Sequence, residues 1–352
     1  MKTAVVLMNL GGPDGLQAVR PFLFNLFNDP AIIDLPQPFR WCLARLISGR
    51  RAPIAREIYQ VLGGSSPLLA NTQRQADALQ SILNDAETSA RFKVFIAMRY
   101  WHPFSDETAA AVEAWGAERV VLLPLYPQFS TTTSGSSIKD WHRAAGARGL
   151  KVPTTAMCCY PAQRGFVDAV AGALGQVLDK LPREASPRVL FSAHGLPKKI
   201  VDKGDPYQWQ VERSVDAVVA SLARADLDWA LCYQSRVGRL VWIGPATEDE
   251  IMRAAGAART IVVVPIAFVS EHSETLVELD VEYRDLAMEN GAAGYHRVPT
   301  VADDGGFIAG LAKLVRDALA QPRAIGCGEG QRICPTTLRR CPLADRSLGE
   351  AQ

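Results

Sequence analysis

Two histidines and a row of glutamates are the residues of this sequence best suited to chemistry. His194 lies in the stretch RVLFSAHGLP, where the apolar run Val189–Phe191 is typical of a buried parallel strand and Pro197 ends it. In open α/β sheets, ligands bind beyond the carboxyl ends of the strands, so we expect His194 to face a cleft. The alternative is a structural histidine that only satisfies hydrogen bonds at the end of the strand.

The second stretch of interest follows a strong strand predicted over Thr260–Phe268, with Ser270 as the N-cap of a helix. Its acids recur at three- and four-residue steps and are predicted to line one helical face without an interleaved base: Glu271, Glu274, Glu278, Glu282 and Asp285. Like charges at this spacing cost about 0.2–0.5 kcal/mol per pair. We interpret the row as a relay of oxygen ligands for a divalent cation, with His272 and Glu274 at its inner end. A solvated acidic surface is the alternative.

Further polar and aromatic residues follow the other predicted strands. Arg99 and Tyr100 come directly after the strand Phe92–Met98, and such a pair suits a planar ligand that carries carboxylates. The hydroxyl-rich run over residues 130–137 is predicted to bind an anion through backbone N–H groups or to be a plain solvated loop. The Gly11-Gly12-Pro13 turn does not match a dinucleotide-binding fingerprint, which argues against a nicotinamide site.

Composition restricts the class of protein. The chain has 352 residues, of which 48% are hydrophobic and 21% charged, as in a soluble globular enzyme. A net charge of +1 gives no reason to expect nucleic acid as a partner. The apolar N-terminal stretch is too short for a signal peptide, and a cytoplasmic location is predicted. Seven cysteines in a cytoplasmic chain favour metal or redox chemistry over disulfides.

The alternation of strands and helices predicts an α/β fold with parallel sheets, in two Rossmann-like domains with a cleft between them. The predicted domains are residues 1–145 plus 304–322, which include a closing C-terminal helix, then residues 146–303, and a cysteine-containing tail over residues 323–352. Lys151–Tyr160 is predicted to be a crossover strand into the second half, and Tyr59–Pro67 a loop.

Residues 20–60 contain large apolar side chains mixed with arginines. Within them, Phe39, Leu43, Leu46 and Ile47 are near helical spacing, and Trp41 lies beside them. The segment is predicted to be either an ordinary amphipathic helix or an exposed apolar lip that rests on a membrane or holds a hydrophobic ligand.

These residues together indicate a cleft with His194 on one wall and His272 and Glu274 on the other, and with a row of carboxylates that leads into it. Such a cleft suits the insertion of a metal into a flat, carboxylate-bearing macrocycle. The chain resembles the ferrochelatase family over essentially its whole length. The motifs that carry this resemblance are LMNLGGP (7–13), GGSSP (63–67), MRYWHP (98–103), LYPQFS (125–130) with TTTSGSS (131–137), LFSAHGLP (190–197), GDPY (204–207), YQSRVG (233–238), GPAT (244–247) and PIAFVSEHSETLVELDVEY (265–283).

The resemblance implies insertion of Fe(II) into protoporphyrin IX, giving protohaem and two protons without an organic cofactor. It assigns catalysis to His194 and Glu274, leaving open which binds the metal and which takes protons. It implies metal delivery or proton release by His272, Glu278 and Glu282. The porphyrin pocket is implied to contain Leu10, Arg99, Tyr100 and Trp242. Leucine at position 10 and the apolar lip favour protoporphyrin over coproporphyrin III, which one branch of the family uses.

The tail has the spacing C-x6-C-x6-C through Cys327, Cys334 and Cys341, and some members of the family hold a [2Fe–2S] cluster with three C-terminal cysteines. Thr131 occupies the position of the internal cysteine of the animal pattern, so the fourth ligand is expected to be Cys158 or Cys159. Zinc and three free thiols are the alternatives. Cys42 and Cys232 are expected to be buried structural thiols.

Two other functions stay open at this point. The chain could be a non-catalytic carrier of a tetrapyrrole or a metal, because a fold does not determine a function. It could also be a cobalt or nickel chelatase for another tetrapyrrole. In every case porphyrin and metal are the expected partners, with weak peripheral association with the inner face of the cell membrane. The oligomeric state is not predicted.

Overall fold

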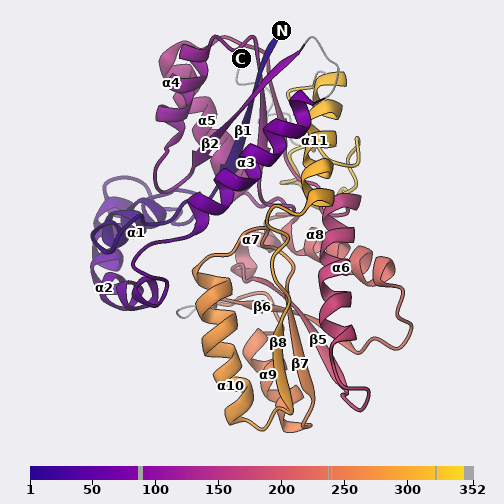
Figure 1. Ribbon diagram of the computed structural model, residues 1–352. Helices are drawn as coiled ribbons and strands as arrows, with labels where there is room; N and C mark the ends of the chain where they lie inside the picture. Colours follow the sequence, from indigo (N-terminus) through magenta and orange to yellow (C-terminus); the bar gives the residue numbers. More distant parts are fainter. Residues whose placement is uncertain (86–89, 237, 239, 322, 345–352) are drawn as a thin grey trace.

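The chain forms two sheets of parallel strands with helices packed around them. The computed structural model describes residues 1–85, 90–236, 238, 240–321 and 323–344. Within these ranges the first sheet has the order β2-β1-β3-β4-β9 and the second the order β6-β5-β7-β8. Figure 1 shows the first sheet in the upper half of the molecule and the second in the lower half.

The strands correspond closely to the apolar runs of the sequence. Seven of the eight residues of β1 are buried, as expected for a strand covered on both faces. The strands of the first sheet are β1 (Lys2–Asn9), β2 (Arg91–Met98), β3 (Arg119–Pro124), β4 (Thr154–Met157) and β9 (Ile325–Gly326). Those of the second are β5 (Pro187–His194), β6 (Trp229–Gln234), β7 (Thr260–Pro265) and β8 (Gly294–Arg297).

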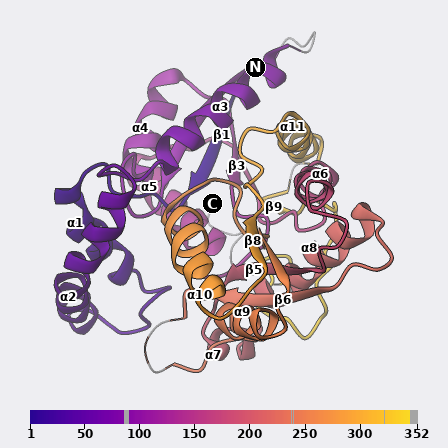
Figure 2. The same cartoon turned by 60° about the horizontal axis from the view of Figure 1, so that its bottom comes forward.

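Helices cover both sheets and also join them. The first sheet is packed by α3 (Leu68–Asn84), α4 (Ser105–Trp115), α5 (Ser134–Arg148) and α11 (Gly305–Ala320). The second half contains α6 (Arg164–Asp179), α7 (Lys198–Asp202), α8 (Tyr207–Leu222), α9 (Thr247–Gly256), the π-helix η2 (Glu274–Glu282) and α10 (Tyr283–Glu289). The short helix η1 (Leu16–Ala18), α1 (Val19–Phe27) and α2 (Phe39–Val61) form a module beside both sheets (Figure 2).

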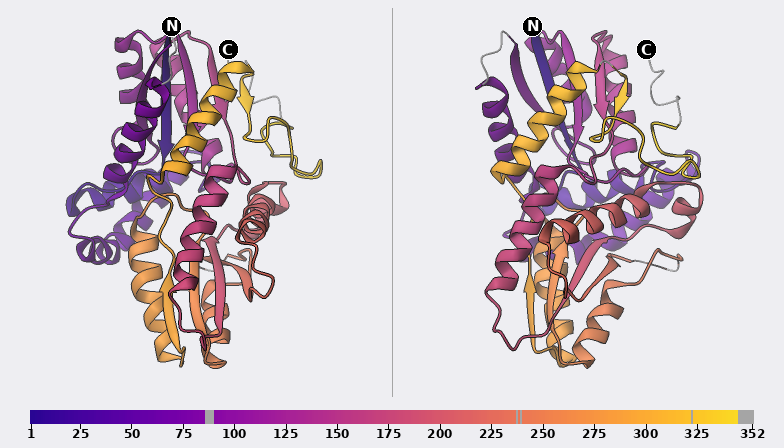
Figure 3. Two further views of the ribbon diagram at one scale, coloured as in Figure 1. Left: turned by 45° about the vertical axis from the view of Figure 1, so that its right-hand side comes forward. Right: turned by 90° about the vertical axis from the view of Figure 1, so that its right-hand side faces the viewer.

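The two halves share one hydrophobic core. A single cluster of buried side chains contains Leu7 of β1, Phe166 of α6, Phe191 of β5 and Phe307 of α11. The rings of Phe166 and Phe307 meet edge to face with their centroids 6.3 Å apart. Because α6 and α11 run along the same side of the molecule (Figure 3), burial of their apolar faces fixes the two sheets relative to each other.

Two boundaries differ from the sequence prediction. The prediction that residues 151–160 lead into the second half is wrong, because β4 pairs with β3 and belongs to the first sheet. The first sheet also includes β9, from the predicted tail. We therefore propose that the two units divide after β4 rather than at residue 146. Tyr59, predicted in a loop, lies within the last turn of α2.

The hydroxyl-rich run is neither a solvated loop nor a site open to an external anion. Its second half begins α5, and its first half binds a carboxylate of the protein itself. The backbone N–H of Thr131 donates to Asp205 Oδ2 over 2.8 Å, and the Thr131 hydroxyl donates to the same oxygen over 2.7 Å. Asp205 is fully buried, and burial raises the pKa of its carboxyl. The run thus fastens the first half of the molecule to the start of α8.

Candidate functional site

The stretch that contains His194 forms β5, and His194 is its last residue. Gly195 follows, and a Cβ there would lie 2.8 Å from the Gln234 carbonyl oxygen, so only glycine lets the ends of β5 and β6 come this close. The Tyr207 hydroxyl donates to the His194 carbonyl oxygen over 3.0 Å. Two neighbouring elements therefore hold the backbone of His194, while its side chain remains 42% exposed.

His194 and Glu274 are in direct contact, although 80 residues separate them in the sequence. Nδ1 of His194 lies 2.9 Å from Oε2 of Glu274. Burial disfavours both charged forms, but the mutual attraction outweighs it. The pKa of His194 is consequently raised, and the pKa of Glu274 is held well below its usual range by His194 and His272. The pair resembles the base-and-orienting-group arrangements of enzymes that move protons.

His272 lies on the other side of the same carboxylate. Its Nδ1 lies 3.0 Å from the Ser270 carbonyl oxygen, and because a carbonyl only accepts, Nδ1 must carry the proton. Nε2, which lies 3.8 Å from Oε2 of Glu274, then has a free lone pair in the neutral ring. A histidine whose other nitrogen donates to a backbone carbonyl is the usual form of a metal-binding histidine.

The segment that contains His272 is fastened to α3 of the first sheet. The buried Gln75 donates Nε2 to the carbonyl oxygens of Val269 and Ala302 over 3.1 and 2.8 Å, and its Oε1 accepts from Ser270 over 3.1 Å. Asn71, one turn earlier, donates to the Glu271 carbonyl oxygen over 2.9 Å. Neither residue was predicted from the sequence. The signal was an Asn and a Gln four residues apart on the buried face of a helix.

The acidic row begins on η2, whose hydrogen bonds run from residue i to i+5. Glu274 and Glu278 are half-buried and Glu282 is exposed, so the row runs from the interior to solvent. Glu278 accepts from the Ser235 backbone N–H over 2.8 Å, the Ser235 hydroxyl over 2.6 Å and Gln234 Nε2 over 2.9 Å. Burial and the charge of Glu274 nonetheless raise the pKa of Glu278. Glu278, whose pKa is raised, binds a proton more readily than Glu274, whose pKa is lowered, and can therefore act as a step in proton transfer.

Ser235, which the sequence analysis did not select, has a backbone φ of 61°, in the left-handed region that a serine rarely adopts. This conformation directs both its N–H and its hydroxyl at Glu278. Strained residues of this kind are concentrated at functional sites.

Two members of the predicted acidic row are not part of it. Glu271 precedes the helix, and its Oε1 lies 2.9 Å from Nη1 of Arg297 on β8. Asp285 is exposed, 3.2 Å from Arg284. The expectation that no base accompanies the row is therefore wrong. Local spacing could not reveal the contact of Arg297, because this residue comes from a different element and meets the acids only in the tertiary fold.

The predicted porphyrin-binding residues of the first half have protein partners. Nη2 of Arg99 lies 2.8 Å from Oδ2 of the buried Asp29, and Tyr100 donates its hydroxyl to the same oxygen over 2.8 Å. Tyr100 is fully buried, and Leu10 is half-buried on the same module. Trp242 is half-buried and pairs with Pro197 in a short antiparallel bridge beside His194. Their roles towards a porphyrin stay a prediction.

The helix predicted as an apolar lip does expose large apolar side chains. Phe39 is 67%, Trp41 44% and Leu46 48% exposed, on the first turns of α2. Arg45 stacks over the Trp41 ring, 5.6 Å from its centroid. At the other end of α2, Tyr59 is buried near Glu274 and hydrogen-bonded to Ser273, and burial raises its pKa to about 12. One helix thus joins an exposed apolar surface to the edge of the His/Glu site.

The five cysteines of the second predicted site are buried. Gln210 of α8 donates Nε2 to Sγ of Cys159 over 3.4 Å and to Sγ of Cys334 over 3.2 Å. Sγ of Cys158 lies 3.5 Å from Sγ of Cys159. The tail also contacts the second half, since the Arg340 N–H donates to the Gly204 carbonyl oxygen over 3.1 Å.

Two further observations concern the cysteines. In the described part of the chain, no three His, Cys, Asp or Glu side chains stand in an arrangement ready to hold a metal ion. Cys232 is buried as expected, but Cys42 is exposed on α2, contrary to the prediction, because it lies on the outer side of the module.

Comparisons with known proteins identify the family. A sequence model described as Ferrochelatase matches residues 2–319. The chain is 52% identical to the ferrochelatase of Caulobacter vibrioides over 98% of each chain. It is 48% identical to that of Pelagibacter ubique, over 97% of this chain and 98% of the other. The chain belongs to the ferrochelatase family.

Ferrochelatases are enzymes that insert iron into a porphyrin in haem biosynthesis, so the predicted family, enzyme class and general reaction are confirmed. The solved structure of SirB from Bacillus subtilis with Fe3+ has a TM-score of 0.52 at 14% identity and covers 91% of this chain and 96% of that one. This likeness concerns the fold alone and confirms the predicted α/β, chelatase-type class. None of the helices in the described ranges is both long and apolar enough to span a bilayer.

Proposed function

We propose that this ferrochelatase inserts Fe(II) into protoporphyrin IX, with His194 and Glu274 acting as one catalytic unit. The observation that supports the proposal is the 2.9 Å contact between them at the end of β5, with His272 on the far side of the carboxylate. The reaction replaces two pyrrole protons by one Fe(II), so the site must accept two protons and offer ligands that release the metal. A neutral imidazole and a carboxylate can do both.

The ionised state of Glu274 is central to this mechanism. Two histidines hold the pKa of Glu274 low, so a proton that reaches the pair resides on His194. The negative charge left on Glu274 attracts the incoming cation, and Nε2 of His272 supplies a second ligand atom nearby.

We propose that Glu278 and Glu282 connect this unit to solvent. Glu278 is next to Glu274 and has a raised pKa, so it can take a proton that Glu274 cannot keep. Glu282 is exposed and one further step along the row. A row of carboxylates that runs from the solvent to the interior can both attract a divalent cation inwards and carry protons outwards.

The porphyrin and its delivery involve the module of α1 and α2. Leu10 packs on this module rather than offering a polar group, which favours the more apolar protoporphyrin over coproporphyrin III. The exposed Phe39, Trp41 and Leu46 suit weak, reversible association of a cytoplasmic enzyme with the inner face of the cell membrane. Replacing Trp41 and Leu43 by Ser is expected to reduce co-sedimentation with liposomes and to weaken porphyrin binding.

We further propose a [2Fe–2S] cluster held by Cys327, Cys334, Cys341 and Cys158, with Cys159 as the alternative fourth ligand. Support comes from the chemistry of the donors: all five thiols are buried and reduced, and Gln210 reaches sulfurs from both segments. When bound, the cluster would supply a structural link or a redox sensor, because chelation transfers no electrons. Anaerobically purified protein is expected to be reddish, with equal iron and acid-labile sulfide. Colourless protein with one zinc, or with free thiols, would contradict this part alone.

One assay tests the central proposal. The protein is incubated anaerobically with Fe(II) and protoporphyrin IX, and the haem spectrum is followed; parallel samples contain coproporphyrin III, or Co(II) in place of Fe(II). Faster turnover with protoporphyrin and Fe(II) is expected. Preference for coproporphyrin would change the substrate assignment, and binding without turnover would identify a carrier.

A further inference from the structure

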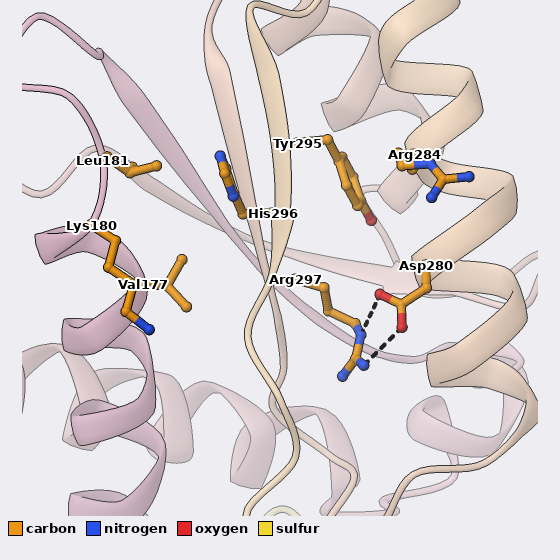
Figure 4. Close-up of a pocket in the computed structure, with 8 residues that line it drawn as sticks. All are labelled: Val177, Lys180, Leu181, Asp280, Arg284, Tyr295, His296 and Arg297. Carbon is orange, nitrogen blue, oxygen red and sulfur yellow. Dashed lines mark hydrogen bonds and ion pairs between the residues drawn. The ribbon is translucent and has the colours of Figure 1, made fainter.

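The edge strand of the second sheet contacts the acidic π-helix through two side chains. Tyr295 and Arg297 are two residues apart on β8 and extend towards the helix that contains Asp280, whereas His296 between them faces α6 (Figure 4). The Tyr295 hydroxyl donates to the Leu279 carbonyl oxygen over 2.6 Å. Arg297 donates Nε and Nη2 to the two Asp280 carboxylate oxygens over 2.6 and 2.8 Å.

The bond to Leu279 explains how η2 keeps its unusual hydrogen-bond pattern. In an α-helix, the carbonyl oxygen of Leu279 would accept from the N–H of Tyr283. Here the Tyr283 N–H donates to Glu278 instead, five residues back. The Leu279 carbonyl thus loses the donor that an α-helix would give it. The Tyr295 hydroxyl donates to the same oxygen and takes the place of that N–H.

Arg297 fixes the same helix from a second direction. Its guanidinium binds Asp280 bidentately, and Nη1 lies 2.9 Å from Glu271, the residue just before His272. The Arg297 side chain is only 10% exposed, so these charge-assisted bonds are stronger than surface pairs. The arginine therefore joins the start of the acidic segment to its middle.

The hydrogen-bond pattern decides where the acids point. In an α-helix of 3.6 residues per turn, each four-residue step rotates a side chain by about 40° from the one before. A π-turn contains more residues than an α-turn, so each residue turns through a smaller angle, and acids at four-residue steps point in other directions than they would in an α-helix. In the π-helical form Glu274 meets His194 and Glu278 meets Ser235.

We propose that Tyr295 and Arg297 are positioning residues that hold η2 in its π-helical form and thereby fix the directions of Glu278 and Glu282 relative to Glu274. The inference rests on the proposed role of the acidic row in handling iron and protons. It adds that this role depends on two side chains of β8 that do not belong to the row.

Tyr295→Phe tests the proposal because it removes a single oxygen atom from a side chain that borders a cavity of about 560 Å³. The crystal structure of the variant is expected to show the Tyr283 N–H bonded to Leu279 in the α-helical pattern. The apparent KM for Fe(II) is expected to rise about fivefold, with kcat changed by less than about twofold. In a background that carries both Glu278→Gln and Glu282→Gln the same substitution is expected to add nothing, because its effect passes through these two acids.

Arg297→Lys provides a second variant that keeps the charge but loses the bidentate contact, and the same direction of change is expected. His296→Gln, on the opposite face of the strand, is the matched control and is expected to leave the KM for Fe(II) unchanged. Retention of the i→i+5 pattern in both Tyr295→Phe and Arg297→Lys would overturn the proposal. If the pattern shifts but neither these variants nor Glu278→Gln alters the KM for Fe(II), the positioning stands and the proposed role of the acidic row fails.

Discussion

At the carboxyl ends of both sheets, acidic side chains lie close to basic ones, but their negative charges are compensated to different degrees. At the first sheet, the buried Asp29 is bonded to Arg99, Tyr100 and Ser136, so its charge is fully compensated. At the second sheet, Glu274 and Glu278 lie side by side with histidines and neutral donors, and His194 remains 42% exposed. The first arrangement stabilises a structure, and the second leaves charge and protonation free to change. On the proposed function, we infer from this difference that the first half holds the substrate site in shape while the second performs the chemistry.

Substitutions at the second sheet are expected to have the largest effect on catalysis. His194→Ala removes the proton acceptor and is expected to lower haem formation by at least about 100-fold, with thermal unfolding close to that of the unmodified protein. Glu274→Gln is expected to be nearly as damaging, whereas Glu278→Gln and Glu282→Gln mainly raise the KM for Fe(II). Steady-state kinetics at varied Fe(II) concentrations separates the effects on kcat from the effects on the KM for Fe(II). Substantial turnover by His194→Ala, or equal losses of kcat at all three glutamates, would contradict the division of roles.

Asp29→Asn provides the corresponding change at the first sheet. Removing one charge of a buried ion pair is expected to lower the free energy of unfolding by about 3 kcal/mol, since Arg99 keeps, among the described residues, only the more distant Asp140, at 3.9 Å, as an ionic partner. Urea denaturation measures this loss, and kcat at a temperature where the variant is folded is expected to change little. If Arg99 instead binds a porphyrin carboxylate, freeing its guanidinium would lower the KM for porphyrin, and that result would move Arg99 into the substrate site.

The pKa of the His194 imidazole provides a further test of the site at the second sheet. The carboxylate of Glu274 raises the pKa of His194, so the imidazole is expected to titrate above the ordinary value of about 6.5. In Glu274→Gln burial, which disfavours the cation, is opposed only by the weaker attraction of Glu278, so the pKa of His194 is expected to fall. Proton acceptance requires the neutral ring, which means that kcat/KM rises with pH through the raised pKa. NMR titration of the imidazole in both proteins measures the shift, and an unchanged pKa in Glu274→Gln would show that the pair is not electrostatically coupled.

Sequence patterns predicted most of the fold and the centre of the site. Buried apolar runs predicted the strands, and His194 was expected at the carboxyl end of one of them, where β5 does end. The remaining features depend on contacts between distant elements. Arg297 neutralises Glu271 and Asp280 from a strand that the acidic pattern did not include. Gln75 supports His272 from a helix nearly 200 residues earlier. The π-helical form of η2 also follows from such contacts, since local propensities distinguish poorly between i→i+4 and i→i+5 hydrogen bonds.

The cysteine tail provides the smallest expected effect, because it lies away from the proton and iron path. Gln210→Met removes the Nε2 donor that contacts Cys159 and Cys334. Reduction adds negative charge to an iron–sulfur cluster, and hydrogen bonds to its sulfurs stabilise that charge, so the variant is expected to have a lower reduction potential. Dye-coupled redox titration measures the shift, while haem formation should change by less than about twofold.

The substitution also removes the acceptor of the Phe129 N–H, so some loss of stability accompanies it. Ser214→Ala is the matched control: it removes a hydrogen bond to the Pro161 carbonyl one turn further along α8, and among the described residues the Ser214 hydroxyl makes no hydrogen bond to the cysteine sulfurs. A potential that falls in Gln210→Met and not in Ser214→Ala would assign the effect to the sulfur contact. Equal potentials in all three proteins would mean that Gln210 only packs against the cysteines, and that the tail is fastened to α8 without being tuned by it.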